Sequence, residues 1–442
     1  MATTGSVILR CTCSIFLVSV AIWSVAFSEP GDGAYIFDKA SERVSGEIWQ
    51  VENTERYQKI TLRDVHVNDE RINSEARTLI LSPAFPPLSI GEKIVFRCNL
   101  EKPEPFNGFR YDRFLASKNV YATCFLKEAP LVIGYAKPTF RTKLLSVRKN
   151  FIKHLDSTFG EPQASLLAGL LVGEKRFTSA WDEKFQRTGT SHIVAASGYN
   201  VAVVSAIMFG LLTYLGLRRP RAFSLILASI IVYVILAGAD APVVRAGVMG
   251  VLVLLSQQFG RKTTMVNVLL VTASTMLFIN PRLMRDDIGF ELSMFSTIAL
   301  IYFAPLLEQK LKFIPEDFSI RESITSTLSA TFFALPIIFL SFGQLSILGP
   351  IANLFVLSFL PATMFFGSIA VVLSYVNPVL AYIASAPAWA LLNLELIMID
   401  ALAQLPYATI LIPSSTKLLL TIFSILLIAY TWRKLSRKTS KQ

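Results

Sequence analysis

The sequence predicts a polytopic α-helical membrane protein with a small extracytoplasmic β-barrel near its N-terminus. Hydrophobic residues make up 53% of the 442 residues and charged residues only 17%, whereas charged residues are about 25% of a typical soluble domain. Beyond residue 190, apolar runs long enough to cross a bilayer follow one another closely. Residues 30–136 are instead polar and rich in β-branched residues, which is typical of strands.

The first apolar segment covers residues 7–28, with Arg10 near its start. It is long enough for a membrane anchor, but the Ala-Phe-Ser triplet at 26–28 also resembles the cleavage site of a signal peptide. We favour an anchor over residues 1–29. Both interpretations send the next region out of the cytoplasm.

Five short runs within residues 30–136 predict strands, and turn signals separate them. They are VSGEIWQV, YQKITLRDVHV, RTLILS, EKIVFRCNL and VYATCFL. Five strands in a region of this size fit a small closed barrel of the OB type. The one expected helix, at residues 111–118, lies between the fourth and fifth strands, which is later than an OB fold normally places it.

Alternation along two of these strands turns two cysteines inward. Cys98 shares a strand face with Ile94 and Phe96, and Cys124 shares one with Ala122. Because exported domains meet an oxidising compartment, we expect a disulfide between the two cysteines. The alternative is two free buried thiols.

Residues 137–190 are expected to form connector helices, of which 137–160 is basic and amphipathic. That helix either lies on a membrane surface or packs under the barrel. Residues 191–432 form the polytopic domain, whose nine spans make ten with the anchor. The nine are 192–216, 222–238, 243–259, 264–280, 288–306, 322–342, 347–376, 379–405 and 414–432.

Basic clusters between the spans predict that both termini are cytoplasmic. These clusters occupy three loops and the tail at 433–442, and they include Arg218, Arg219, Arg221, Arg261, Lys262, Lys310, Lys312 and Arg321. The barrel then lies outside. The loop at 281–287 is an exception, because it places Arg282 and Arg285 on the outer side, offset by two aspartates.

The most informative polar stretch opens the first of the nine spans. His192, Ser197, Gly198 and Asn200 stand there at the start of an apolar run. Polar groups at membrane depth are costly, so they usually face a cavity, a pathway or a partner helix. The Ser-Gly pair also weakens the helix and permits close backbone approach.

Further polar residues accompany breaks in later spans. The Gly- and Pro-containing segment 238–247 carries Asp240 and Arg245, and it is either a turn with a satisfied ion pair or the lining of a pathway. Glu291 opens another span at a depth similar to that of Arg245, so the two are placed to pair. Asn353 follows a Gly-Pro that indicates a kink or re-entrant start, and a lone intramembrane Asn is more often helix–helix glue than a substrate contact.

His192, Ser197 and Asp240 also suggest a membrane-embedded hydrolase or lipid-modifying enzyme. Against it, a spacing of five does not place His192 and Ser197 on one helical face, and no G-x-S-x-G frames the serine. We find no nucleotide-binding, metallo-nuclease or zinc-ligand pattern, so neither a cofactor nor a metal is expected. A small-solute transporter is a third hypothesis, but the halves of the membrane domain show no inverted repeat.

Four blocks of the sequence, in order, resemble the ComEC family of competence proteins. They are G-T-x-H-I-V-A-x-S-G-x-N-V at 189–201, PVVRA at 242–246, GFELS at 289–293 and LPIIFLSFGQLSILGPIANL at 335–354. The resemblance extends over residues 30–430 and includes the family's periplasmic OB-like domain. It implies an inner-membrane channel through which single-stranded DNA enters during natural transformation.

The resemblance also implies which residues line the DNA path. Asn200 stands where many members have His, and Glu291 stands where Gln is common. The full expected set is His192, Ser197, Gly198, Asn200, Asp240, Arg245, Glu291 and Asn353. Many members carry a C-terminal metallo-β-lactamase-like domain for strand degradation, whereas this sequence stops at Gln442. We therefore expect that another protein supplies that step, that this member lacks it, or that the chain is truncated or repurposed.

The partners implied by the resemblance are single-stranded DNA, membrane lipid, a DNA receptor, a cytoplasmic motor and a second copy of the chain. The barrel region, residues 29–128, has 14 basic and 16 acidic residues, a net charge of −2 within a chain of +11. That charge predicts weak DNA binding by the barrel alone. Its aromatic residues are expected mostly in the core: Trp49, Tyr57, Phe96, Phe106, Phe109, Tyr111 and Tyr121.

Overall fold

The computed structural model describes most of the chain, and this part divides into two compact units. The described residues are 16–17, 19–20, 42–53, 57–72, 76–105, 110–137, 139–194, 197–239, 241–260, 264–314, 320–413 and 415–439. The helical unit comprises 1–19, 151–279 and 288–442, and the sheet unit comprises 20–150 and 280–287. The expected anchor therefore lies almost entirely outside the described residues, and Asp240 lies outside them too.

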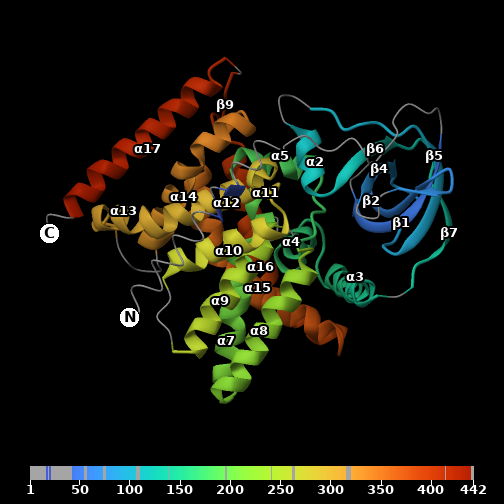
Figure 1. Ribbon diagram of the computed structural model, residues 1–442. Helices are drawn as coiled ribbons and strands as arrows, with labels where there is room; N and C mark the ends of the chain where they lie inside the picture. The colour runs from blue at the N-terminus through green and yellow to red at the C-terminus, as the bar shows by residue number, and fades with distance from the viewer. Residues whose placement is uncertain are drawn as a thin grey trace. The chain divides into compact units, whose positions relative to one another are not determined.

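The sheet unit is built on a seven-stranded sheet (Figure 1). Its strands are β1 (Glu42–Asn53), β2 (Tyr57–Val67), β3 (Glu70–Arg71), β4 (Arg77–Pro83), β5 (Glu92–Cys98), β6 (Val120–Phe125) and β7 (Leu131–Tyr135). The order is β6-β4-β2-β1-β5-β7, with β3 paired to β2. The β4–β6 pair is parallel, and the other pairs are antiparallel. All five expected strands are present.

Alternation along these strands builds an apolar core in the sheet unit. Ile60, Leu62, Ile80 and Ile94 are completely buried within it. The expected helix is present as α2 (Tyr111–Ser117), between β5 and β6. The period-2 pattern therefore predicts correctly which side of β4, β5 and β6 is buried.

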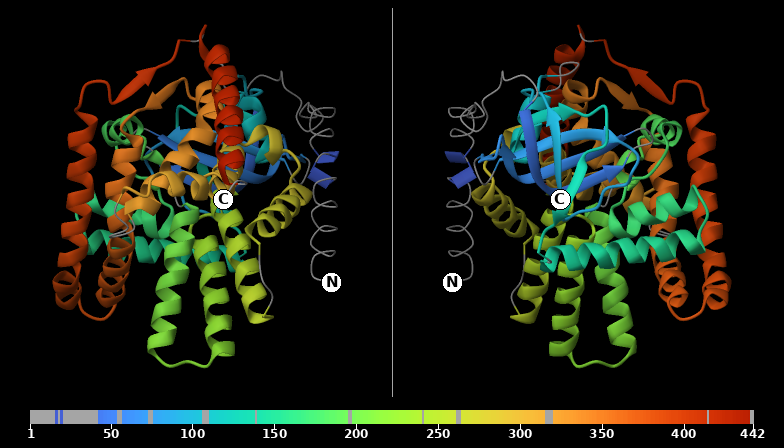
Figure 2. Two further views of the ribbon diagram at one scale, coloured as in Figure 1. Left: turned by 90° about the vertical axis from the view of Figure 1, so that its left-hand side faces the viewer. Right: turned by 90° about the vertical axis from the view of Figure 1, so that its right-hand side faces the viewer.

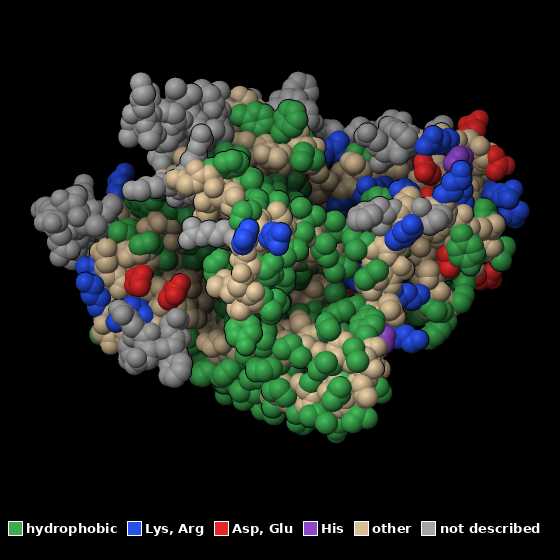
Figure 3. All heavy atoms as spheres, turned by 90° about the horizontal axis from the view of Figure 1, so that it is seen from below, with side chains coloured by type: hydrophobic (Ala, Val, Ile, Leu, Met, Phe, Trp, Pro, Cys, Tyr) green, Lys and Arg blue, Asp and Glu red, His purple; other side chains and the backbone are tan. Residues whose placement is uncertain are grey.

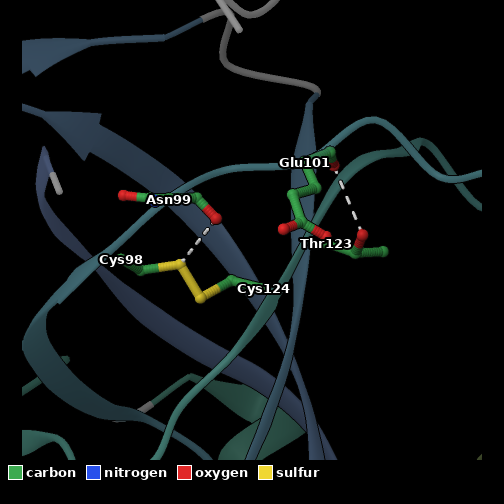
Figure 4. The surroundings of a disulfide bond; sticks show 5 residues. All are labelled: Cys98, Asn99, Glu101, Thr123 and Cys124. Atoms are coloured by element: carbon green, nitrogen blue, oxygen red, sulfur yellow. Dashed lines mark hydrogen bonds between the residues drawn. A yellow bond between two sulfur atoms is a disulfide. The ribbon is translucent and has the colours of Figure 1, made fainter. Parts of the chain in front are cut away.

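A disulfide joins the end of β5 to β6, and Figure 4 shows its surroundings. Cys98 and Cys124 are both buried, with 6% and 5% exposed. Beside them, the backbones of Glu101 and Thr123 exchange two hydrogen bonds of 2.9 Å each. The chain after β5 is thus fastened to β6 by both covalent and backbone bonds.

Helices occupy each of the nine regions in which spans were expected (Figure 1). They are α7 (Gly198–Tyr214), α8 (Arg219–Leu236), α9 (Ala241–Gln258), α10 (Met265–Ile279), α12 (Ile288–Tyr302) followed by α13 (Ala304–Lys310), α14 (Ile320–Ser341), α15 (Gly349–Ser374), α16 (Pro378–Ala403) and α17 (Lys417–Thr439). Among the described residues, α9, α14, α15 and α16 are long and apolar enough to cross a membrane, and α12 with α13 forms a fifth candidate bent by 47°. The protein is therefore a multi-pass membrane protein, and the count of ten spans stays a prediction.

The connector region forms α3 (Phe140–Thr158), α4 (Gln163–Val172), α5 (Ser179–Arg187) and α6 (Ser191–Val194). Every residue of α4 from Ala164 to Val172 is buried. It packs against α15 and α16, which lie side by side (Figure 2). The same core includes Leu155, near the end of α3, and Phe159, which directly follows that helix.

Large hydrophobic side chains are exposed along many helices of the helical unit, and they cover much of the face seen in Figure 3. Phe209, Phe278 and Tyr382 are examples, with 62%, 76% and 76% exposed. Such extensive exposed apolar surface indicates contact with lipid rather than water.

Two side chains of the segment between α10 and α12 hold the end of α2. Nδ2 of Asn280 donates to the carbonyl oxygen of Ser117 at 2.8 Å, and Nη1 of Arg282 donates to that of Ala116 at 3.1 Å. Arg282 also donates to the hydroxyl of Tyr121 at 2.9 Å. The last carbonyls of a helix lack intrahelical donors and favour a cation. The arginine that departed from the basic-loop pattern therefore has a structural role within the sheet unit.

Candidate functional site

The C-terminal end of the buried helix α4 lies close to the N-terminal end of α7, and a polar network joins these two helix ends. The carbonyl oxygen of Leu170 accepts from Nδ2 of Asn200 at 3.1 Å and from the hydroxyl of Tyr233 at 3.0 Å. Oγ of Ser197 donates to Oδ1 of Asn200 at 3.2 Å. Because the last carbonyls of α4 have no donor within their own helix, this network satisfies one of them in the protein interior.

Glycines allow the backbones around this network to approach closely. A Cβ on Gly169 of α4 would lie 2.4 Å from the carbonyl oxygen of Val194 in α6. A Cβ on Gly198, the first residue of α7, would lie 3.2 Å from the Cβ of Ala246 in α9. The neighbour of Ala246 is Arg245, which is only 4% exposed.

The segment from α5 to the start of α7 contacts the first half of α15 and the residues just before it. Oγ of Ser346, just before α15, donates to the carbonyl oxygen of Arg187 at 2.8 Å. Further along, the hydroxyl of Tyr199 donates to the carbonyl oxygen of Leu357 at 3.2 Å. Asn353 lies on α15 between these two contacts, so it is close to the segment that carries the first polar motif.

Asn353 has an unusual environment for a buried amide. It is 7% exposed, and its Oδ1 accepts no hydrogen bond from any described residue. Asn200, by contrast, is 1% exposed and fully engaged through both side-chain atoms. The site thus combines a satisfied polar network with a buried acceptor that has no protein donor within the described part of the chain.

The structure brings together only part of the expected set. Ser197, Gly198 and Asn200 lie at the α4–α7 junction, with Asn353 near them on α15. His192 is exposed on the short helix α6. The remaining described members lie on other helices: Arg245 on α9 and Glu291 on α12, two helices that contact each other. Their pairing stays a prediction.

The described contacts of Ser197 do not resemble those of an activated nucleophile. Its hydroxyl donates to the amide oxygen of Asn200, and an amide is not a general base. Within the described ranges, no three side chains of His, Cys, Asp or Glu gather as a metal site.

Sequence reasoning overlooked Glu395, a buried carboxylic acid on α16. It is 1% exposed, and its Oε1 accepts from Oγ1 of Thr363 on α15 at 2.8 Å. Its Oε2 has no hydrogen-bond partner among the described residues. The signal was present, because Glu395 is the one acidic residue in the apolar run from 378 to 399, and such residues are functional candidates by default.

Comparison with known proteins identifies the family. Residues 170–437 match the family model described as "Competence protein". The chain is similar to ComE operon protein 3 of Bacillus subtilis (strain 168), with 27% identity over 237 residues. The alignment covers 53% of this chain and 29% of that relative. The matched part of the chain therefore corresponds to less than a third of the relative's length. No solved structure matches the chain significantly.

Proposed function

The chain belongs to the competence protein family, and from this premise we propose that it forms the route by which single-stranded DNA crosses the bacterial inner membrane. The family favours a transport role over an enzymatic one, and the contacts of Ser197 give the hydrolase alternative no support.

The observation that carries the proposal is the buried Oδ1 of Asn353 on α15, which has no hydrogen-bond partner among the described residues. A buried polar atom without a donor is rare and calls for a missing partner such as water, an ion or a ligand. Broken helices at membrane depth are tolerated where they are buried in protein or line a polar cavity. A polar path past Asn353 accounts for the buried oxygen without a donor and for the helix breaks among the spans.

In this proposal the sheet unit is an OB-like domain on the outer side, and both termini are cytoplasmic. The parallel β4–β6 pair and the antiparallel β1–β5 pair support the OB-like assignment. The described chain offers no nucleotide-binding motif, so the mechanism is passive. A receptor delivers the DNA, the ten spans and a second copy surround the path, and a cytoplasmic motor pulls the strand.

The test follows labelled DNA into the cytoplasm of a strain lacking this protein, with wild type, Asn353→Leu or Thr275→Val restored. Asn353→Leu is expected to lower entry about tenfold, the effect of roughly 1.4 kcal/mol on a barrier, at unchanged protein level. Thr275→Val is the matched control, because Thr275 is exposed on α10 and its hydroxyl is bonded within its own helix.

Loss of entry in the deletion strain, while DNA still reaches the outer side, supports the route. Unchanged entry in the deletion strain refutes it. If the deletion abolishes entry but Asn353→Leu behaves like Thr275→Val, the route exists and does not pass Asn353.

A further inference from the structure

The outer face of the sheet carries a layered cluster of aromatic and basic side chains. We call Trp49, Arg63, Arg77, Phe114 and Lys118 the Trp49 cluster. The guanidinium carbons of Arg63 and Arg77 lie 4.6 Å and 4.9 Å from the centroid of the Trp49 ring. Nζ of Lys118 lies 4.6 Å from the centroid of the Phe114 ring. These distances are typical of cation–π contacts.

The strands explain why this cluster faces outward. On β1, β2 and β4, the neighbours Ile48, Leu62 and Thr78 are completely buried. Trp49 and the two arginines are only partly buried, and they contact one another away from the core. Because Leu62 pairs with Thr78 across β2 and β4, the arginines that flank them come together. The cluster therefore extends over three adjacent strands.

The stack of Trp49 with its two arginines is connected to the Lys118–Phe114 pair by hydrogen bonds. Nη1 of Arg77 donates to the carbonyl oxygen of Lys118 at 3.4 Å. The backbone N–H of Arg77 also donates to the carbonyl oxygen of Asn119 at 2.8 Å. The stack of Trp49 with Arg63 and Arg77 and the Lys118–Phe114 pair thus form one continuous surface from β1 to the end of α2.

The cluster is locally positive although the sheet region as a whole is not. Among the described residues, one carboxylate is paired with it: Oε1 of Glu47 accepts from Nη2 of Arg63 at 2.6 Å. Burial, and secondarily the nearby charge of Arg63, lower the pKa of Arg77. Within the described part of the sheet, three cations against one paired carboxylate leave an excess that attracts an anion, because binding depends on local field rather than net charge.

We propose that the Trp49 cluster binds single-stranded DNA, with Arg63, Arg77 and Lys118 contacting phosphates and bases stacking on the guanidinium and aromatic faces. Single-strand sites combine a positive groove with stacking aromatics, and the arginine plane stacks on bases as well as on indole. This binding proposal rests on the proposed function, and it locates where the incoming DNA strand is first bound on the sheet unit.

The experiment measures binding of fluorescent oligo(dT) of 20 nucleotides to the full chain in detergent, over a range of salt concentrations. The variants are the double change Arg63→Gln/Arg77→Gln and, as the matched control, Arg97→Gln. Arg97 is an exposed arginine on β5 outside the cluster. An abasic oligonucleotide of the same length separates stacking from phosphate contact. Hydrogen exchange in the sheet core verifies that each variant is folded.

The double variant is expected to bind about tenfold more weakly, and the slope of log affinity against log salt falls by about 1.4, because each phosphate contact on a single strand contributes about 0.7. Arg97→Gln stays close to wild type, and the abasic probe binds more weakly than oligo(dT). Wild-type affinity and slope in the folded double variant overturn the proposal, as does equal binding of the two probes.

Different outcomes refute the proposed DNA route and the proposed role of the Trp49 cluster. If cytoplasmic DNA entry requires this protein but the double variant binds and takes up DNA normally, the route stands and the Trp49 cluster is not its site. If the deletion strain takes up DNA normally, the proposed function itself fails.

Discussion

Gly169 provides a sharp test of how α4 is packed. A Cβ at this position would lie 2.4 Å from a backbone carbonyl oxygen, that of Val194. Real Cβ atoms essentially never come this close, and the backbone cannot rotate away as a side chain can. We therefore expect Gly169→Ala to push α4 away from α6 and to disturb the network at Leu170.

The cost can be worked from this geometry. Overpacking a close contact costs about 1–3 kcal/mol, and a backbone neighbour places Gly169→Ala at the upper end. Replacing a helical glycine by alanine returns up to about 1 kcal/mol through helix propensity. The net loss is about 2 kcal/mol, which is close to a thirtyfold change in the folded-to-unfolded ratio.

The matched control is Gly210→Ala, also within a helix. A Cβ on Gly210 meets nothing within 4 Å, so only the propensity gain remains. The assay is thermal unfolding in detergent, read as the fraction of protein resistant to protease, together with DNA entry in cells. Equal behaviour of the two variants would refute the packing argument.

Three further predictions follow from individual contacts. Cys124→Ser removes a crosslink to Cys98 over a separation of 26 residues, and the chain-entropy relation predicts a loss of about 3.5 kcal/mol; hydrogen exchange of the sheet core measures it, and unchanged protection contradicts it. Thr363→Val leaves Glu395 without its hydroxyl donor and costs about 1–3 kcal/mol, whereas the double change Thr363→Val/Glu395→Leu recovers most of this loss; a double-mutant cycle on thermal unfolding decides. Arg282→Gln weakens the hold on the end of α2 by about 1–2 kcal/mol, so amide exchange in α2 accelerates while that of α4 does not change.

The nine helical regions and the five main strands were predictable, because each depends on a local pattern. The helices of the apolar region are indicated by uninterrupted apolar runs, and the helix break near Gly238 is indicated by a glycine and a proline. The main strands are indicated by alternation of apolar and polar side chains. β3 has only two residues, and β7 is a run, LVIGY, without polar alternation, so neither gives a local signal.

The contacts of the site depend on tertiary structure and were less predictable. Asn200 stood out as polar in an apolar context, but its acceptor, the Leu170 carbonyl, belongs to a backbone that carries no sequence signal. Trp49 was expected with the aromatics of the core. Two register shifts interrupt simple alternation in β1, between Ser45 and Glu47 and between Ile48 and Gln50. Trp49 lies within the second shift, so counting by twos does not fix its side.

The segment between α10 and α12 has a practical consequence for anyone who isolates the sheet unit. A fragment cut as one continuous stretch from residue 42 to 137 omits Asn280 and Arg282, and it leaves the last carbonyls of α2 without their donors. Such a fragment is expected to fray at α2, next to Lys118. Joining residues 280–287 to the fragment through a flexible linker restores the two donors, and comparing the two fragments by amide exchange separates the effect of excision from the properties of the sheet itself.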